Sequence, residues 1–230
     1  MSNKGPERPR IVANFAMTAD GKISTRNHTP SLFTSPADKR RLLEIRADCD
    51  AVLAGRGTVA ADTMSMGLAD AVLQAERVSR RKPPVPLRVL LTNAGRLDPK
   101  WKVFRYRESP LVVFSGRRMP ESVRGRVAPF CDLHIFDSDE VPVEAMLAIL
   151  RRDYRIRRLV CEGGATLFRT LAGRGLVDEI FLTVAPVIFG GAGAPTLTGR
   201  PGDFFPEAVE FRIAKMDVRD GECFLHLKRR

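Results

Sequence analysis

Residues 159–191 constrain the fold of this 230-residue chain more than any other stretch. A short apolar run, Leu159-Val160-Cys161, ends at Glu162-Gly163-Gly164 and passes directly into a helical pattern. Apolar side chains recur there at helical spacing until two glycines end the pattern, and a long apolar run then covers residues 180–184. A strand, a helix and a second strand in succession predict an α/β protein with a mainly parallel sheet.

The Glu162-Gly163-Gly164 turn predicts an anion-binding site at the start of this helix. Glycine has no Cβ, so an anion can approach main-chain N–H groups, where unpaired donors and the helix dipole favour negative charge. Thr166 adds a hydroxyl donor, and Glu162 places a carboxylate at the rim of the turn. A Gly-Gly pair is equally common as a tight turn between a strand and a helix, so the rest of the chain decides between the two readings.

The alternation of strands and helices continues along the chain. Strands are expected at residues 10–17, 51–54, 87–92, 111–114, 132–136, 158–161 and 179–184, with helices in the intervals. Ser35 followed by Pro36 predicts the start of one helix, and the apolar stripe of another consists of Val143, Met146, Leu147 and Leu150. Two further strands, 208–217 and 222–228, flank Asp220-Gly221, which is a hairpin signal.

Length and composition indicate one folded domain. The chain is long enough for a large α/β domain, so we expect a flexible tail at residues 1–9 and a single domain at residues 10–230. No apolar run approaches the length of a membrane span, and the polar start MSNKGPERPR lacks the apolar region of a signal peptide. We therefore expect a cytoplasmic protein.

Cysteines and histidines give no clear metal or disulfide signal. The cysteines stand far apart without a C-x-x-C pair, so we expect buried thiols at Cys49, Cys131, Cys161 and Cys223. The histidines are His28, His134 and His226, and they show no close ligand spacing, so no metal site is expected. A metal site that uses all three of them stays open as the alternative.

The net charge of +11 favours a rival class, a basic RNA-binding protein, because basic surfaces attract phosphate groups. The basic residues come in short clusters, without the interleaved aromatic residues that stacking on bases needs. Nucleic acid is therefore not the expected partner, and part of the charge is expected to steer small polyanionic ligands.

Four blocks in family order resemble the reductase domain of riboflavin biosynthesis, a member of the dihydrofolate reductase-like superfamily. The blocks are Thr18-Ala19-Asp20-Gly21-Lys22, Phe33-Thr34-Ser35-Pro36 with its helix to Arg46, Ala51 to Asp62 with the Gly55-Arg56-Gly57-Thr58 turn, and Glu162 to Gly191. The resemblance implies a three-layer α/β/α fold with a mostly parallel central sheet and an antiparallel C-terminal hairpin, and by analogy a homodimer. The H-x-E and P-C-x-x-C motifs of the zinc deaminase that is often fused to this reductase do not occur in the sequence.

The resemblance implies NADPH as cofactor and delivery of hydride to C1′ of 5-amino-6-(5-phosphoribosylamino)uracil, or its pyrimidinedione analogue, which opens the ribose to a ribityl chain. Lys22 is expected to stabilise negative charge that develops beside the ribose, and Glu162 to accept hydrogen bonds from the substrate. The other expected substrate-binding residues are Asp20, Arg46 and Met66. The expected cofactor-binding residues are Met17, Thr58, Asp62, Asn93, Gly163, Gly164, Ala165, Thr166 and Leu167.

One position departs from the family pattern. Ala69 stands where relatives carry an arginine that helps to hold the substrate phosphate. Either another basic residue takes this role, with Arg77, Arg80 and Arg88 as candidates, or the substrate differs and is a pterin or another heterocycle.

Two further expectations concern the surroundings of the site. The polar, proline-rich segment 74–86 is expected to be a mobile loop near the mouth of the site. A bidentate arginine suits the 2′-phosphate of NADPH, and the candidates are Arg56, Arg96 and Arg117.

Overall fold

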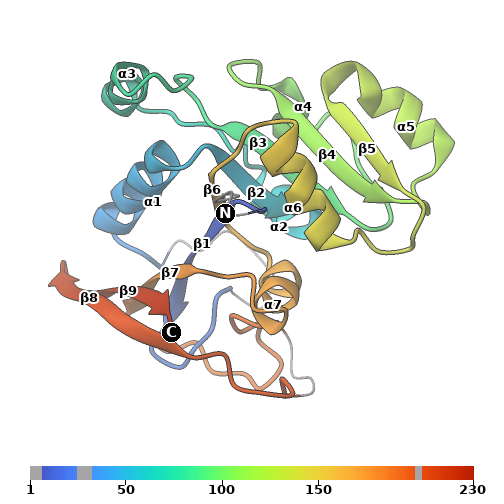
Figure 1. The fold of residues 1–230 in the computed structure, drawn as a ribbon. Coiled ribbons are helices and arrows are strands. Elements are labelled where there is room, and N and C mark those ends of the chain that lie inside the picture. Colours follow the sequence, from blue (N-terminus) through green and yellow to red (C-terminus); the bar gives the residue numbers. More distant parts are fainter. Residues whose placement is uncertain (1–6, 25–32, 200–203) are drawn as a thin grey trace, which may run out of the picture. The chain divides into compact units, whose positions relative to one another are not determined.

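The computed structural model describes residues 7–24, 33–199 and 204–230, in which strands and helices alternate as the sequence predicts (Figure 1). The strands are β1 Arg10–Thr18, β2 Ala51–Gly55, β3 Leu87–Thr92, β4 Leu111–Gly116, β5 Asp132–Phe136, β6 Arg158–Cys161, β7 Glu179–Ala185, β8 Phe211–Arg219 and β9 Glu222–Arg229. The α-helices are α1 Pro36–Asp48, α2 Arg56–Asp62, α3 Ala71–Ser79, α4 Lys102–Arg105, α5 Glu121–Val127, α6 Val143–Arg152 and α7 Ala165–Gly173, and a 3-10 turn covers Ala128–Phe130.

Hydrogen bonds order the strands β5-β4-β3-β2-β6-β1-β7-β9-β8, which is a mixed sheet. The pairs β1–β7, β2–β3, β3–β4 and β4–β5 are parallel, whereas β9 is antiparallel to both of its neighbours. The expected sheet, mostly parallel with an antiparallel C-terminal hairpin, is therefore confirmed. None of the helices in the described ranges has the length and apolar character that crossing a membrane requires.

The chain divides into two compact units, and the first contains Met1–Arg10 and Arg46–Leu159. Here β2, β3, β4 and β5 pair in parallel, with Ala51 opposite Leu87 and Arg88 opposite Leu111. Apart from Arg88 in β3, the cores of the central strands are apolar, as strands buried on both faces require. Fully buried side chains on them are Val52, Leu53, Val89, Leu90, Val113 and Phe114, each of which stabilises the fold by about 1.5–3 kcal/mol.

The second unit contains Ile11–Ile45 and Val160–Arg230. In it β1 pairs in parallel with β7, and β9 lies antiparallel between β7 and β8. The β8–β9 loop is Asp220-Gly221, with φ of 51° and 80°, as a two-residue hairpin turn with positive φ at both positions requires. The predicted hairpin is therefore confirmed, although β8 begins at Phe211 and not at Ala208.

The start of α1 is fixed as the sequence predicts. Ser35 Oγ accepts a hydrogen bond from the N–H of Asp38 at 3.3 Å, and Pro36 is the first helical residue. The structure adds a partner from a distant strand, because Ser35 donates from N and Oγ to the carboxylate of Glu222 at 2.8 and 2.5 Å. The end of β9 nearest the hairpin thus anchors the N-terminus of α1. In the first unit, the predicted apolar stripe of α6 is also buried.

The expectation of a loop at residues 74–86 is wrong over its first half. Residues 71–79 form α3, and the side chain of Asp70 caps it by accepting from the N–H of Leu73 at 2.9 Å. Only Leu73 and Arg77 of this helix are buried, so its apolar stripe is too short to stand out in the sequence. The helix depends instead on Arg77, which is 1% exposed.

Candidate active site

The predicted anion-binding turn lies between β6 and α7 in the second unit. Glu162 follows the last residue of β6 and is half-buried, and Gly163 has a φ of 98° that favours glycine. Gly164 is the N-cap of α7 and offers no side-chain cap. The first helical N–H groups, those of Ala165, Thr166 and Leu167, therefore remain available as donors to an anion.

The side chains of this turn point to different tasks. Thr166 is exposed, so its hydroxyl can reach a ligand, and its carbonyl accepts from Thr170 Oγ1 at 3.0 Å. The side chain of Leu167 is 6% exposed and packs in the interior. Only its main-chain N–H is open to a ligand at the turn. The Gly163–Gly164 peptide bond is cis.

Lys22 lies in a tight turn after β1, which neighbours β6 in the sheet. The turn is closed by Thr18, whose N–H donates to Lys22 O at 2.8 Å and whose Oγ1 accepts from Lys22 N at 2.9 Å. Gly21 has a φ of 78° and donates to Thr18 O at 2.9 Å. Met17, on β1, is half-buried. Lys22 and Glu162 thus both follow the carboxyl ends of neighbouring strands.

Asp20 holds the main chain of this turn against a distant loop. Its carboxylate accepts from Thr18 Oγ1 at 2.5 Å, from Phe189 N at 3.2 Å and from Gly190 N at 2.7 Å. The Thr18 hydroxyl and the two amides lower the pKa of Asp20. Because both carboxylate oxygens already accept hydrogen bonds, we assign Asp20 to positioning of the Lys22 turn; its contact with substrate stays a prediction.

Arg46 and Met66 are brought together in the first unit. Arg46, in the last turn of α1, is 8% exposed, and its Nη1 donates to Gly67 O at 2.6 Å. Met66 is fully buried and has a φ of 62°, which is unusual for a residue with a Cβ. The guanidinium predicted to bind substrate therefore also supports the segment that contains Met66.

Three predicted cofactor residues lie in the first unit. Thr58 is on α2 and half-buried, and Asp62 is the last residue of that helix. Asn93 follows β3, and its Oδ1 accepts from Val141 N at 3.1 Å. This bond gives Asn93 a structural task, so its predicted contact with adenosine would fall to the rest of its side chain.

Two of the arginines that were candidates for binding the substrate phosphate in place of the residue at position 69 are buried. Arg77 and Arg88 are 1% and 2% exposed, and both direct their guanidinium groups to main-chain carbonyls. Their burial was not visible in the sequence because arginine is a residue type that is mostly exposed. Arg80 is exposed and forms an ion pair with Glu76 at 3.6 Å.

The candidates for the 2′-phosphate also differ in their surroundings. Arg117 Nε lies 2.9 Å from Asp139 Oδ1, and its Nη1 lies 3.9 Å from Asp137. These carboxylates compete with a phosphate for Arg117. Arg56 is half-buried at the start of α2, and Arg96 is exposed after β3.

No group of three or more histidine, cysteine, aspartate or glutamate side chains in the described parts of the chain could hold a metal ion. His134 bonds to Tyr154 at 2.7 Å, and His226 bonds to Glu179 at 2.7 Å, so each has a partner within its own unit. His28 lies outside the described residues.

Comparison with known proteins agrees with this arrangement. The RibD C-terminal domain family matches residues 9–221. A 2,5-diamino-6-ribosylamino-4(3H)-pyrimidinone 5′-phosphate reductase of Archaeoglobus fulgidus is 33% identical over 94% of this chain and 96% of its own length. A reductase of the same name from Methanothermobacter thermautotrophicus is 31% identical over 90% of this chain and 92% of its length.

A solved structure has the same fold. A pyrimidine reductase-like protein from Corynebacterium diphtheriae superposes with a TM-score of 0.85 over 96% of this chain and 92% of that chain, at 17% identity. The match to the family extends over most of the sequence, and it includes the Lys22 turn and the Glu162-Gly163-Gly164 turn. The chain therefore belongs to the RibD C-terminal domain family.

Proposed function

We propose that this protein reduces a ribosylamino-pyrimidine 5′-phosphate to its ribityl form, with NADPH as the cofactor. The observation that carries the proposal is the Glu162-Gly163-Gly164 turn, where a carboxylate directly precedes a helix whose N-cap offers no side chain. Two relatives that match this chain over most of their length are named as reductases of such a substrate. The proposed homodimer and the single domain at residues 10–230 stay predictions.

The residues present fit a cofactor that carries a pyrophosphate. The N-terminus of α7 offers main-chain donors and the positive end of a helix dipole, and Gly164 leaves space for close approach. Ala165, Thr166 and Leu167 would hold the pyrophosphate through their N–H groups. When bound, a nicotinamide cofactor supplies the hydride; the protein supplies binding, orientation and electrostatics.

On the substrate side, Lys22 and Glu162 have complementary tasks. The Lys22 ammonium would stand beside the ribose and stabilise the negative charge that develops as its ring opens. Glu162 would accept hydrogen bonds from ribose hydroxyls or a pyrimidine N–H, which fixes C1′ in position. The bonds between Thr18 and Lys22, and those of Asp20, keep the main chain of the Lys22 turn in place.

NADPH is expected to bind much more tightly than NADH and to raise the melting temperature, because a ligand that binds only the native state stabilises it. The physical reason for the preference is an arginine that pairs with the 2′-phosphate. Fluorescence titration of both cofactors against the parent, Arg56→Met and Arg96→Met tests it. Equal affinity of the parent for both cofactors would contradict the phosphate contact, and no binding of either would contradict the reductase proposal.

Gly164→Val is expected to weaken NADPH binding far more than it lowers the melting temperature. The new side chain would crowd the N–H groups at the start of α7, whereas the φ of −73° at Gly164 is open to residues with a Cβ. A titration and a thermal scan of the same sample measure both effects. Gly125→Val is the matched control, because a Cβ added at Gly125 in α5 would meet no other atom within 4 Å. Parental cofactor affinity in Gly164→Val would mean that the Gly-Gly pair only forms the turn between β6 and α7 and does not bind the cofactor.

A further inference from the structure

The segment of residues 64–69 is held by two side chains of the first unit, those of Arg46 and Gln74. Arg46, from the last turn of α1, donates from Nη1 to Gly67 O at 2.6 Å. Gln74, from α3, donates from Nε2 to the adjacent carbonyl of Leu68 at 2.7 Å. Successive carbonyls of an irregular segment are therefore satisfied by donors on different elements, which fixes the path of its main chain.

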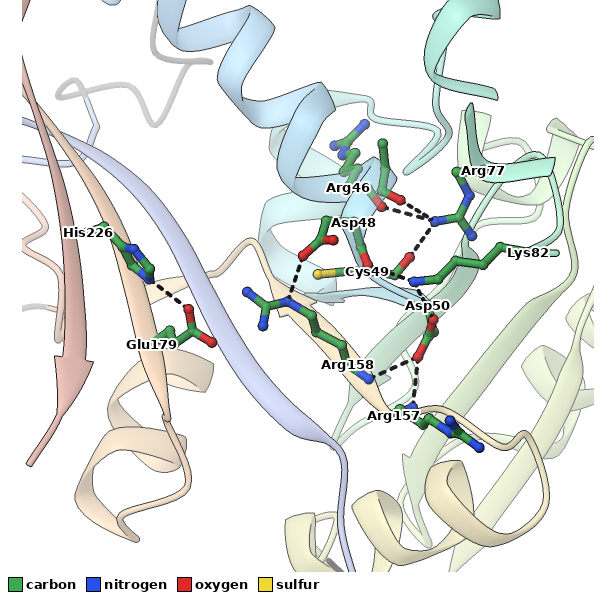
Figure 2. Close-up of polar contacts among 11 residues, drawn as sticks. Arg46, Asp48, Cys49, Asp50, Arg77, Lys82, Arg157, Arg158, Glu179 and His226 are labelled. Atoms are coloured by element: carbon green, nitrogen blue, oxygen red, sulfur yellow. Dashed lines mark hydrogen bonds and ion pairs between the residues drawn. The ribbon is translucent and has the colours of Figure 1, made fainter. Parts of the chain in front are cut away.

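Arg77, on α3, connects the helices that carry Arg46 and Gln74. From α3 its Nη1 donates to Ala47 O at 2.8 Å and to Cys49 O at 2.5 Å, which are main-chain acceptors at the end of α1 (Figure 2). Its Nε donates to Pro83 O at 2.8 Å, so the chain that leaves α3 is bound as well. Figure 2 shows the Arg77 guanidinium directed at main-chain carbonyls at the end of α1.

Burial of the Arg77 guanidinium has a cost in free energy. Arg77 is 1% exposed, burial lowers its pKa, and its Nη2 has no hydrogen-bond partner within the described part of the chain. An apolar side chain of similar volume would avoid the cost of burying a charge but would leave the carbonyls of Ala47, Cys49 and Pro83 without this donor. The arginine also provides direction, because its planar fork binds α3 to carbonyls at the end of α1 in one geometry.

The held segment contains backbone that needs such support. Met66 has a φ of 62°, and Thr63, directly before the segment, has a φ of 46°; both values are sparsely populated for residues with a Cβ. A Cβ on Gly67 would lie 2.4 Å from Cζ of Tyr106, so this main chain packs directly on an aromatic ring. Conformations of this kind persist where the surroundings over-determine them, and they concentrate at functional sites.

We propose that Arg77 is a positioning residue for substrate binding: through the end of α1 and through α3 it keeps Arg46 and Gln74 in place, and these fix the segment 64–69 for the substrate. The inference rests on the proposed function and on the expectation from the sequence that Arg46 and Met66 bind the substrate. Arg77 itself touches neither substrate nor cofactor.

The test compares Arg77→Met, Arg77→Lys and Gln74→Met with Arg81→Met, an exposed arginine just beyond α3. KM and kcat for the ribosylamino-pyrimidine phosphate, the Kd of NADPH, and the exchange rate of the Gly67 amide are measured on each full-length variant. Arg77→Met and Gln74→Met are expected to raise KM by about tenfold, as loss of a charge-assisted or buried hydrogen bond does, with faster Gly67 exchange and unchanged NADPH Kd. Arg77→Lys should restore part of the loss, because an ammonium can still donate to the carbonyls.

Parental KM and parental Gly67 exchange in both Arg77→Met and Gln74→Met would overturn the proposal. So would a loss of NADPH affinity that parallels the rise in KM, because that indicates general loosening of the fold. If Arg77→Met does not fold, Gln74→Met carries the test alone. If the parent ignores the pyrimidine substrate, the proposed function fails, and Gly67 exchange still decides whether Arg77 positions the segment.

Discussion

Glu162→Gln and Lys22→Met are each expected to lower kcat by about a hundredfold or more, while the Kd of NADPH stays at the parental value. Glutamine keeps the shape of Glu162 but loses the charge that strengthens its hydrogen bonds to the substrate. Methionine keeps the stem of Lys22 but cannot stabilise negative charge at the opening ribose. Turnover is followed by NADPH consumption with the ribosylamino-pyrimidine phosphate, and cofactor affinity by a separate binding titration.

Exposed residues of α1 supply matched controls for both changes. Glu44→Gln and Lys39→Met alter the same charges on solvent-facing positions and are expected to leave turnover unchanged. Parental rates in Glu162→Gln and Lys22→Met would remove these residues from the substrate side. If the parent does not reduce this substrate but reduces a pterin, the departure from the family pattern at Ala69 reflects a different substrate.

Arg88→Met is expected to lower the free energy of unfolding by about 3 kcal/mol or more, because it leaves buried acceptors without a donor. Arg88 donates to Val103 O at 2.5 Å, Tyr106 O at 3.0 Å, and both Oγ and O of Ser109 at 3.1 and 2.7 Å. Methionine fills much of the same volume, so the loss measures hydrogen bonding more than an empty cavity.

Urea unfolding of the parent and Arg88→Met gives this difference. Arg107→Met is the control in the same segment: Arg107 is exposed and stacks over Phe130 at 5.0 Å, so its loss should cost about 1 kcal/mol or less. Burial lowers the pKa of Arg88 to about 10, which keeps it charged at neutral pH. A loss below that of Arg107→Met would mean that the carbonyls find other donors.

The regular elements followed closely from the sequence because their signals are local. Residues 87–92, 132–136 and 158–161 are apolar or alternating runs between turn residues, and the structure has strands with these bounds. Asp220-Gly221 likewise encodes its turn within two residues. Helix α3 was missed because Leu73 and Arg77 alone face the interior, and an arginine does not read as a core residue.

The parts of the candidate site that are formed by neighbouring residues could be predicted from the sequence. The parts that are held by residues far apart in the chain could not. The start of α7 and the tight turn at Lys22 are each encoded within a few residues. The bond from Gly190 N to Asp20 joins residues 170 positions apart, and that from Ser35 to Glu222 joins residues 187 apart. No local pattern signals such pairs, so the sequence alone did not show that the Asp20 carboxylate accepts from two main-chain amides and a hydroxyl.

The two buried arginines change what the net charge of +11 says about behaviour in solution. Arg77 and Arg88 count in the sum, yet neither buried guanidinium can contact a phosphate of a polyanion or an anionic group of a resin. The salt concentration that elutes this protein from a cation exchanger, and the slope of its residual affinity for RNA against salt, should therefore follow the surface lysines and arginines alone. Replacing either buried arginine by methionine should leave the elution position of the folded protein nearly unchanged, although the sequence charge falls by one.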